Sequence, residues 1–429
     1  MTAGANRAAI NLDEFRQGWQ IVALSVVGVA ISINAALLYG FGVLVIPLEQ
    51  AFGWQRSSLQ AAITFLFGGA VIGLQLVGWL NMRFGMKRVT VLSLLSMALG
   101  YLATTLIGGS IWSLYFAFFM LPIIGMGALA VTWTQLLNLW FHRNRGLALA
   151  IGLSGTGITA ALVPRLLSWG VDAWDWRAAF VILALLNVFV GIPLTLWWFR
   201  LPAVVDKAAH GRDQEPLSDA GPRLLITGMS FAEGLASPRF WICNVALSLV
   251  VSAVVGLVTS TVPMLRDKGL SAADAAVVFG YFGVSLILGR LVVGYLLDRL
   301  WPPGVAAISL SLPAVGCLIF LSGQTELGML SVAAALIGLG AGAEFDIAAF
   351  LIARYFGLRE YGRLFGLHQG LITVASAAAP LLFAAMLNLT STYSAMLVYC
   401  TAASLLGAVL LLALGRSPLY ELQPEAAKA

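Results

Sequence analysis

Apolar runs of about 20 residues recur along the whole chain, and they restrict its fold more than any other feature. A helix needs about 20 apolar residues to cross the hydrocarbon core of a bilayer, which is about 30 Å thick. Twelve runs reach roughly that length, near residues 19–47, 57–80, 89–108, 111–140, 146–168, 177–199, 239–264, 273–297, 304–322, 328–355, 362–388 and 393–415. We predict an all-α membrane protein with twelve transmembrane helices.

The composition excludes a water-soluble globule. Of the 429 residues, 60% are hydrophobic and only 10% are charged, and the mean hydropathy is +0.93. A soluble core could not hide so much apolar surface. The sequence has no cluster of metal ligands, no Ser–His–acid arrangement and no nucleotide-binding motif. We therefore expect neither an enzyme nor a cofactor or metal.

Lys and Arg are unevenly distributed among the segments that join the spans. If both termini are cytoplasmic, the segments on the opposite side hold only Arg56, Arg165, Arg177, Arg266 and Lys268. Cationic residues favour the cytoplasmic side of a membrane. The asymmetry predicts a multi-pass protein of the cell inner membrane with both termini cytoplasmic. It also accounts for the net charge of +5 without a nucleic-acid partner.

The two halves of the chain repeat each other. The longest polar stretch, Leu201 to Arg223, separates two sets of six runs, and one offset relates Pro47 to Pro263 (263 − 47 = 216), Gly78 to Gly294 and Gly146 to Gly362. We predict two pseudo-symmetric six-helix bundles, 1–200 and 238–429, joined by a cytoplasmic linker at 201–237. Transporters built from parallel repeats of this kind bind substrate at mid-membrane, between the halves.

Arg290 lies in the middle of a predicted span. A guanidinium cannot lose its charge in a protein, and placing it at membrane depth costs at least about 2.5–3.5 kcal/mol. Such residues usually face a water-filled cavity on a substrate path. We interpret Arg290 as the anchor for a small organic anion. The alternative is that Arg290 is only a structural partner of Asp346.

Two loop motifs carry a resemblance to a known family. Gly78-Trp-Leu-Asn-Met-Arg-Phe-Gly-Met-Lys-Arg88 and Gly294-Tyr-Leu-Leu-Asp-Arg299 resemble the paired loop motifs of the major facilitator superfamily. The first copy has Met82 where that family usually has Asp, whereas the second copy keeps Asp298. The resemblance implies the major facilitator fold and a latch for its outward-facing state. The latch residues would be Gly78, Arg83, Gly294, Asp298 and Arg299.

Shorter stretches are similar to one branch of that family, the monocarboxylate transporters and oxalate–formate antiporters. They are Gly18-Trp19, the run from Tyr39 to Ser57 and the run from Trp140 to Gly157. By this resemblance Arg290 matches an eighth-span Arg that binds the substrate carboxylate. Tyr39 and Leu286 stand where proton-coupled animal members have Lys and Asp, and Ile372 stands where the oxalate exchanger has a second cation. A single fixed cation favours a monoanion over a dianion.

Three more ionisable residues lie deep in the second half. Counted along their helices at about 1.5 Å per residue, Asp346 and His368 reach a depth similar to that of Arg290, so we expect one polar cluster in which Arg290 pairs with Asp346 when the site is empty. Glu344 and Asp346 lie about 200° apart around a helix, so only one of them can face the cavity. Asp346, Glu344 and His368 are the candidate proton carriers, because burial raises the pKa of a carboxyl and an unperturbed His titrates near neutrality. His368 is also a candidate for binding the substrate, with a packing role as its alternative.

The first half offers only uncharged candidates for the opposite wall of the cavity. Asn34, Tyr39, Gln75, Thr132 and Gln135 could donate hydrogen bonds to a substrate. The alternative for each is a hydrogen bond that holds two helices together.

We predict a secondary active transporter that moves small monocarboxylates across the inner membrane by alternating access, with protons as the coupling ion. The alternatives are an organic anion exchanger and an uptake carrier for aromatic acids. A multidrug exporter and a non-transporting sensor fit the sequence less well, because the fifth span lacks the usual exporter pattern and no long cytoplasmic domain is present. The expected partners are a small organic monoanion, protons and membrane lipid, and the expected state is a monomer or weak dimer.

Overall fold

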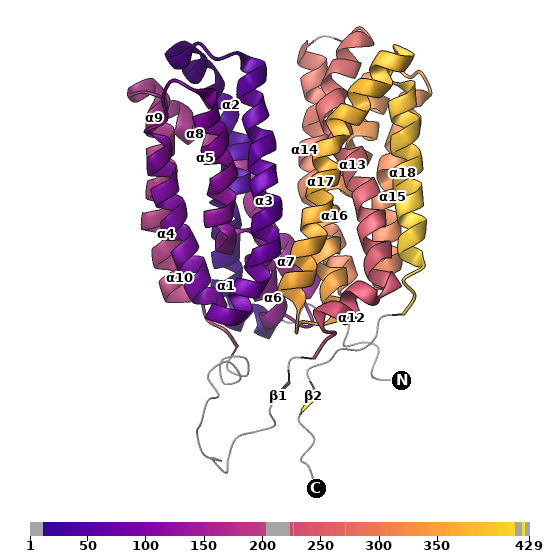
Figure 1. Cartoon of the computed structure of the whole chain (residues 1–429). Coiled ribbons are helices and arrows are strands. Elements are labelled where there is room, and N and C mark those ends of the chain that lie inside the picture. Colours follow the sequence, from indigo (N-terminus) through magenta and orange to yellow (C-terminus); the bar gives the residue numbers. More distant parts are fainter. Residues whose placement is uncertain (1–11, 203–223, 226, 271, 417–422, 425–429) are drawn as a thin grey trace, which may run out of the picture.

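The computed structural model describes residues 12–202, 224–225, 227–270, 272–416 and 423–424, which form two bundles of helices side by side (Figure 1). The predicted N-terminal tail and most of the predicted linker lie outside these ranges. The first bundle contains α1 (Leu12–Ala30), α2 (Ile33–Phe52), α3 (Arg56–Phe84), α4 (Met86–Thr104), α5 (Ile111–Ile124), η2 (Met126–Ala128), α6 (Ala130–Trp140), α7 (Arg145–Leu153), α8 (Gly155–Ala173), α9 (Trp176–Leu186), the π-helical turn η3 (Asn187–Gly191) and α10 (Ile192–Trp198).

The second bundle follows a short helix, α12 (Phe231–Ala236). It contains α13 (Pro238–Asp267), α14 (Ala272–Leu297), α15 (Pro302–Leu321), α16 (Leu327–Phe356), α17 (Tyr361–Thr390) and α18 (Ser394–Leu412). Two-residue strands, β1 (Leu224–Leu225) and β2 (Gln423–Pro424), pair antiparallel below the bundles. Within the described ranges the helices make twelve crossings, six in each bundle, which confirms the predicted fold class.

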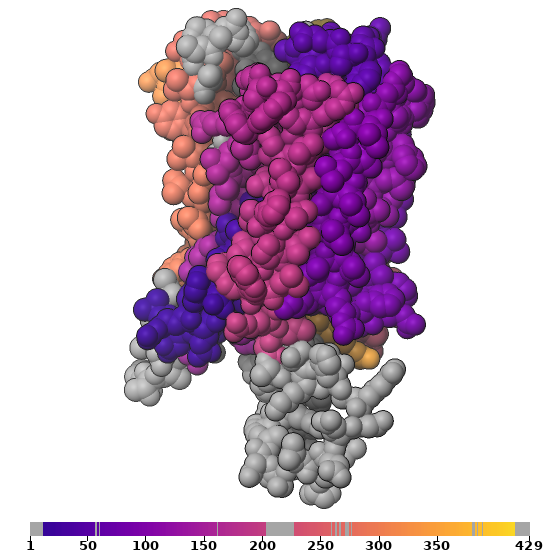
Figure 2. All heavy atoms as spheres, turned by 90° about the vertical axis from the view of Figure 1, so that its left-hand side faces the viewer, coloured from indigo at the N-terminus to yellow at the C-terminus, as the bar shows by residue number. Residues whose placement is uncertain are grey.

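Length and hydropathy identify these crossings as membrane spans. Among the described residues, ten helical segments are long and apolar enough to cross a membrane, and Ile111–Ile124 is a shorter apolar helix. On the outside of the first bundle, α9 and α10 (magenta) pack beside α4 (purple) (Figure 2). Large apolar side chains of this bundle are exposed, among them Phe189 and Trp197, each 70% exposed. Apolar side chains on the outside of a bundle suit lipid as the surrounding solvent.

Several crossings of the first bundle are interrupted, whereas those of the second bundle are continuous helices. The first crossing breaks between α1 and α2 at Ile31 and Ser32, and the fifth breaks between α7 and α8 at Ser154. A break leaves backbone groups without their usual intrahelical partners, which membrane proteins tolerate only where protein or water can satisfy them. The break at Ser154 matters for the candidate site described below.

The two bundles meet at the end of the molecule from which the linker leaves, and they stand apart at the other end (Figure 1). We call these the linker end and the far end. At the linker end, a Cβ added to Gly78 of α3 would lie 2.4 Å from the carbonyl carbon of Gly362 on α17, and one added to Gly146 of α7 would lie 2.3 Å from the carbonyl oxygen of Gly294 on α14. Only glycine permits such close backbone contact.

The internal repeat of the sequence relates these two contacts to each other. The offset of 216 residues found in the sequence turns Gly78 into Gly294 and Gly146 into Gly362, so a pseudo-two-fold axis exchanges the pair Gly78–Gly362 with the pair Gly294–Gly146. Two pairs of glycines from the internal repeat are therefore points where the halves touch.

One of the two contacts carries an additional polar connection. The Asp298 carboxylate accepts hydrogen bonds from the backbone N–H groups of Gly146 at 2.6 Å and Leu147 at 3.0 Å, in the first turn of α7. A carboxylate at a helix N-terminus is favoured by the unpaired N–H groups and by the helix dipole. The equivalent position in the first half is Met82, which cannot accept such bonds. The remaining predicted latch residues lie beside aromatic rings, since Arg299 stacks on Tyr295 at 3.6 Å and Arg83 lies 5.8 Å from the ring of Phe84.

Replacing Gly78 by Val should shift the protein away from the conformation with a closed linker end. The added atoms would overlap the backbone of α17, and overpacking of this kind costs about 1–3 kcal/mol. Spin labels on the two halves should report a longer distance at the linker end. Gly108→Val is the matched control, because a Cβ there meets nothing within 4 Å. An unchanged distance in Gly78→Val would contradict the assigned contact.

Asp298 should make closure of the linker end depend on pH. Burial raises the pKa of the Asp298 carboxyl to about 6, against its hydrogen bonds from Gly146 and Leu147, which lower it. The pKa returns toward 3.8 once opening restores water to the carboxyl. The closed form thus binds the proton more tightly, and acidification from about pH 6 toward pH 4 should favour closure.

The measurement is the same distance between spin labels, followed as a function of pH. Asp298→Asn should lose the part of the pH dependence that this carboxyl contributes. If the Asp298→Asn variant kept the wild-type pH profile, another group would have to be responsible.

Candidate functional site

Arg290 lies on α14 with only 6% of its surface exposed. Its Nε atom is 3.4 Å from Oδ2 of Asp346 on α16 and donates a hydrogen bond to the carbonyl oxygen of Gly342 at 3.2 Å. The predicted pairing of Arg290 with Asp346 is confirmed. One edge of the guanidinium is therefore held within the second bundle.

Small residues bring α14 and α16 close enough for this pairing. A Cβ added to Gly342 would lie 2.0 Å from the carbonyl oxygen of Leu286, and one added to Gly289 would lie 2.2 Å from that of Leu339. Backbones this close leave no room for lipid or water between the helices. The Arg290 side chain then finds its partners on the neighbouring helix, as buried cations in membranes must.

The other edge of the guanidinium crosses to the first bundle. Nη1 donates hydrogen bonds to the carbonyl oxygen of Leu153 and, at 3.3 Å, to Oγ1 of Thr156. Leu153 is the last residue of α7, and the break at Ser154 leaves its carbonyl free of the usual helical partner. The end of a helix carries partial negative charge, which favours a cation there. Arg290 thus joins the two bundles where α7 ends.

Leu153 and Thr156 were not among the residues predicted for the site. The sequence around them, Gly152-Leu-Ser-Gly-Thr-Gly157, reads as a run of small residues that lets helices approach closely. A run of Ser, Thr and Gly in the middle of a span also permits a helix break. That signal could have indicated a carbonyl open to a buried cation.

The two carboxyls of α16 point in different directions, as their spacing predicts. Asp346 faces Arg290, whereas Gly340, one turn before Glu344 on the same face, packs on Pro313 of α15. Glu344 is 6% exposed, and its Oε2 has no hydrogen-bond partner among the described residues. It still interacts electrostatically with Arg290 and Asp346. Asp346 is therefore the carboxyl in direct contact with the cation.

Tyr39 is the predicted residue of the first bundle that reaches Arg290. It lies on α2 with 43% of its surface exposed, and its phenol group interacts electrostatically with the guanidinium. Asn34 lies earlier on the same helix, and its Oδ1 has no hydrogen-bond partner among the described residues.

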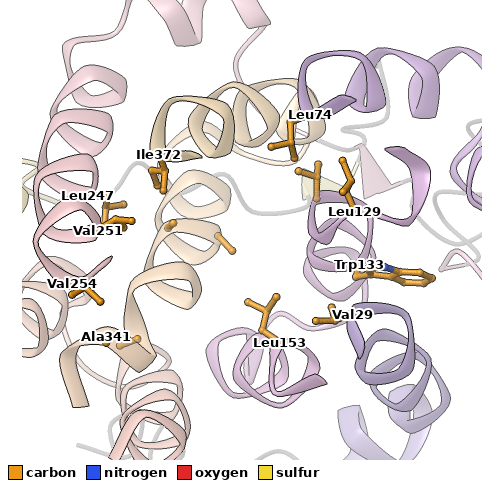
Figure 3. Packing of buried hydrophobic residues seen from close by; sticks show 14 of the residues in the cluster. Val29, Leu74, Leu129, Trp133, Leu153, Leu247, Val251, Val254, Ala341 and Ile372 are labelled. Carbon is orange, nitrogen blue, oxygen red and sulfur yellow. The ribbon is translucent and has the colours of Figure 1, made fainter. Parts of the chain in front are cut away.

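Two apolar residues lie near the space between the bundles. The Leu153 side chain points into this space (Figure 3). Ile372 of α17 is buried, and it brings no second cation.

The other polar candidates of the first bundle lie at contacts between helices. Gln75 donates to the carbonyl oxygen of Gly366 on α17 at 3.3 Å, and Gln135 lies beside Gly362 at the closed linker end. Thr132 is fully buried and accepts a hydrogen bond from Asn81 at 3.2 Å. In this conformation all three hold helices together and none of them faces open space beside Arg290.

His368 does not join the cluster that the sequence predicts. Its ring is fully buried, and Nδ1 lies 2.8 Å from Oδ1 of Asn244 on α13. Nε2 has no partner among the described residues. The depth predicted from the sequence measures only how far along its helix His368 lies. It does not say toward which neighbouring helix the side chain points. On α17, Gly366 and Gly370 face α3, and His368 points to α13 instead.

Comparisons with known proteins agree with this architecture. Residues 27–344 match the Major Facilitator Superfamily. A gallate transporter from Pseudomonas putida is 27% identical over 380 residues, which cover 78% of this chain and 82% of that protein. Monocarboxylate transporter 13 from Rattus norvegicus is 24% identical over 406 residues, covering 92% and 89%. The structure of the fucose:proton symporter FucP from E. coli superposes with a TM-score of 0.65 at 14% identity, covering 93% of this chain and all of that one.

Asp346→Asn should destabilise the protein, because it leaves the buried guanidinium of Arg290 without a counter-charge. Removing one partner of a buried ion pair costs about 3–5 kcal/mol. Thermal unfolding of the detergent-solubilised protein should show a clearly lower midpoint. Glu344→Gln is the matched control two residues away, and its effect should be smaller. Equal midpoints for wild type and Asp346→Asn would show that the pair contributes nothing to the fold.

Proposed function

The chain belongs to the Major Facilitator Superfamily, and from this membership and the surroundings of Arg290 we propose that it is a proton-coupled carrier of small monocarboxylates, aromatic acids among them. The observation that carries the proposal is a permanently charged guanidinium at mid-membrane, held between the two bundles by hydrogen bonds to neutral oxygens and by an ion pair with the Asp346 carboxylate. The residues that contact substrate are Arg290, Thr156 and Tyr39.

Arg290 is the group that binds the carboxylate of the substrate. A guanidinium offers several N–H donors in a plane, and charge-assisted bonds to a carboxylate are about twice as strong as bonds to neutral oxygens. An incoming carboxylate can therefore replace the Leu153 carbonyl and the Thr156 hydroxyl as partners of Nη1. The exchange loosens the connection between α7 and α14, which has to break before the linker end can open.

The charges around Arg290 favour a monoanion and a coupled proton. With the site empty, Arg290 and Asp346 form a neutral pair. When a monocarboxylate takes the guanidinium, Asp346 becomes an uncompensated buried charge, which is costly in a medium of low dielectric constant. Uptake of one proton by Asp346 restores neutrality. Loaded and empty carriers are then both uncharged at the site, with one proton moving per monoanion. Glu344, which interacts with both groups, is the second candidate for holding the proton.

The relatives indicate the chemical range of the substrate. One is named a gallate transporter and another a monocarboxylate transporter, and gallate is an aromatic acid with one carboxylate. We include monocarboxylates with and without an aromatic ring in the proposal. Neither type calls for a second fixed cation, in keeping with Ile372 on α17.

The direction of transport follows from the proposed orientation. With both termini cytoplasmic, the linker end is the cytoplasmic end, and the site is approached from the outside in this conformation. The carrier would load from outside and release inside once the linker end opens. A single chain supplies every residue named here, in keeping with the proposed monomer or weak dimer. The roles of Gly78, Arg83, Gly294, Asp298 and Arg299 as a latch belong to the same proposal.

Uptake into proteoliposomes tests the proposal directly. Purified protein should accumulate labelled pyruvate or benzoate when the outside is more acidic than the inside, and collapse of the pH gradient should abolish accumulation. Arg290→Lys keeps the charge but loses the planar set of donors. Losing a hydrogen bond to a charged group costs about 1.5–3 kcal/mol, so uptake should fall at least about tenfold.

Undiminished uptake by Arg290→Lys would remove the anchor role from this residue. Accumulation driven by an internal anion, and indifferent to the pH gradient, would favour exchange over symport. Arg177→Lys is a matched control, because Arg177 pairs with Asp175 at the surface and has no part in the proposed site or latch.

A further inference from the structure

Three glycines leave open space between α8 and α14, on the far-end side of Arg290. A Cβ added to Gly157 of α8, or to Gly280 or Gly283 of α14, meets no atom within 4 Å. The contrast with the linker end is sharp, because a Cβ added to Gly294 would lie 2.7 Å from Cβ of Ala150. The two helical stretches that touch at the linker end therefore separate as they pass Arg290.

The open glycines of α14 lie on the side of this helix that is turned toward the first bundle. On α14, the spacing of Gly280, Gly283, Arg290 and Gly294 places all four within about 80° around the helix. Gly294 contacts α7, so this is the face of α14 turned toward the first bundle. On the facing side, Gly157 follows Thr156, whose hydroxyl accepts the hydrogen bond from Arg290. Gly157, Gly280 and Gly283 thus each adjoin open space on the far-end side of the guanidinium and of the Thr156 hydroxyl. We call the space between them the glycine slot.

The shape and chemistry of the glycine slot point to a particular kind of substrate. The two helical stretches approach each other at the linker end and separate toward the far end (Figure 1). The slot is therefore narrow beside Arg290 and wider toward the far end. Helix surfaces without side chains present flat, apolar backbone, and Ile287, 50% exposed, lies on the same face of α14. Polar groups are found at the floor, where Arg290 and Thr156 lie, and across the space at Tyr39. A planar apolar body with one carboxylate at its end matches this arrangement.

We propose that Gly157, Gly280 and Gly283 determine the substrate class, because the glycine slot takes the planar ring of an aromatic carboxylate whose charged end binds Arg290 and Thr156. This inference rests on the proposed function, and it adds the residues that admit a ring. A small acid such as pyruvate uses the floor alone and does not need the slot. Side chains in place of the glycines would fill the space that a ring requires.

The test compares uptake of labelled benzoate and labelled pyruvate in proteoliposomes. Gly283→Leu should reduce benzoate uptake about tenfold or more and leave pyruvate uptake within about twofold of wild type. Gly157→Leu fills the slot from the opposite helix and should have the same selective effect, and Gly283→Ala should have a smaller one. The matched control is Val292→Leu, because Val292 is 52% exposed and lies about 180° away from Gly283 and about 120° away from Gly280 around α14.

The outcomes separate the inference from the function on which it rests. Benzoate uptake that is unchanged in both Leu variants overturns the glycine slot, as does equal loss of both acids in both variants. A wild-type protein that moves pyruvate but not benzoate also overturns the slot and leaves the monocarboxylate function intact. A wild-type protein that moves neither acid, in either direction of the pH gradient, overturns the proposed function itself. Retained pyruvate uptake in a Leu variant shows that the variant is folded.

Discussion

The structure depends on how one guanidinium is accommodated at mid-membrane. Arg290 cannot lose its charge, so every edge of it must meet an oxygen. Asp346 and the Gly342 carbonyl supply partners from the second bundle, and the Leu153 carbonyl and Thr156 supply them from the first. Close packing of α14 on α16 and the break between α7 and α8 both serve this single requirement. The same residue therefore joins the halves and carries the charge that a substrate carboxylate would need.

The proposed rocking of the two bundles would act at the places where they touch. The contacts Gly78–Gly362 and Gly146–Gly294 are related by the internal repeat, and each brings two backbones together without side chains between them. Contacts of this kind contribute little specific bonding, so they can form and separate as rigid bodies move. The additional hydrogen bonds from Gly146 and Leu147 to Asp298 exist on one side only, since Met82 occupies the related position. Two symmetric backbone contacts thus differ in that only one of them has hydrogen bonds to a carboxylate.

The candidate site draws on features of backbone as much as of side chains. A helix end at Leu153 provides a carbonyl, and glycines above it provide room, although neither has a side-chain function of its own. Polar side chains in the sequence were poorer predictors of which residues lie at the site. Gln75, Gln135 and Thr132 connect helices, and only Tyr39, with Asn34 on the same helix, comes from the predicted opposite wall. In a bundle that lipid surrounds, most polar side chains satisfy one another.

The sequence by itself determined that the chain crosses a membrane twelve times, that its halves repeat, and that Arg290 pairs with Asp346. Length, hydropathy and the period of the helix suffice for these, because they fix how far along the membrane normal each residue lies. Only the tertiary structure decided which way each residue points. His368 has the predicted depth but faces Asn244, and the Leu153 carbonyl meets Arg290 through a helix break. Rotation of a helix about its axis is set by packing against its neighbours, and no single segment of sequence contains that information.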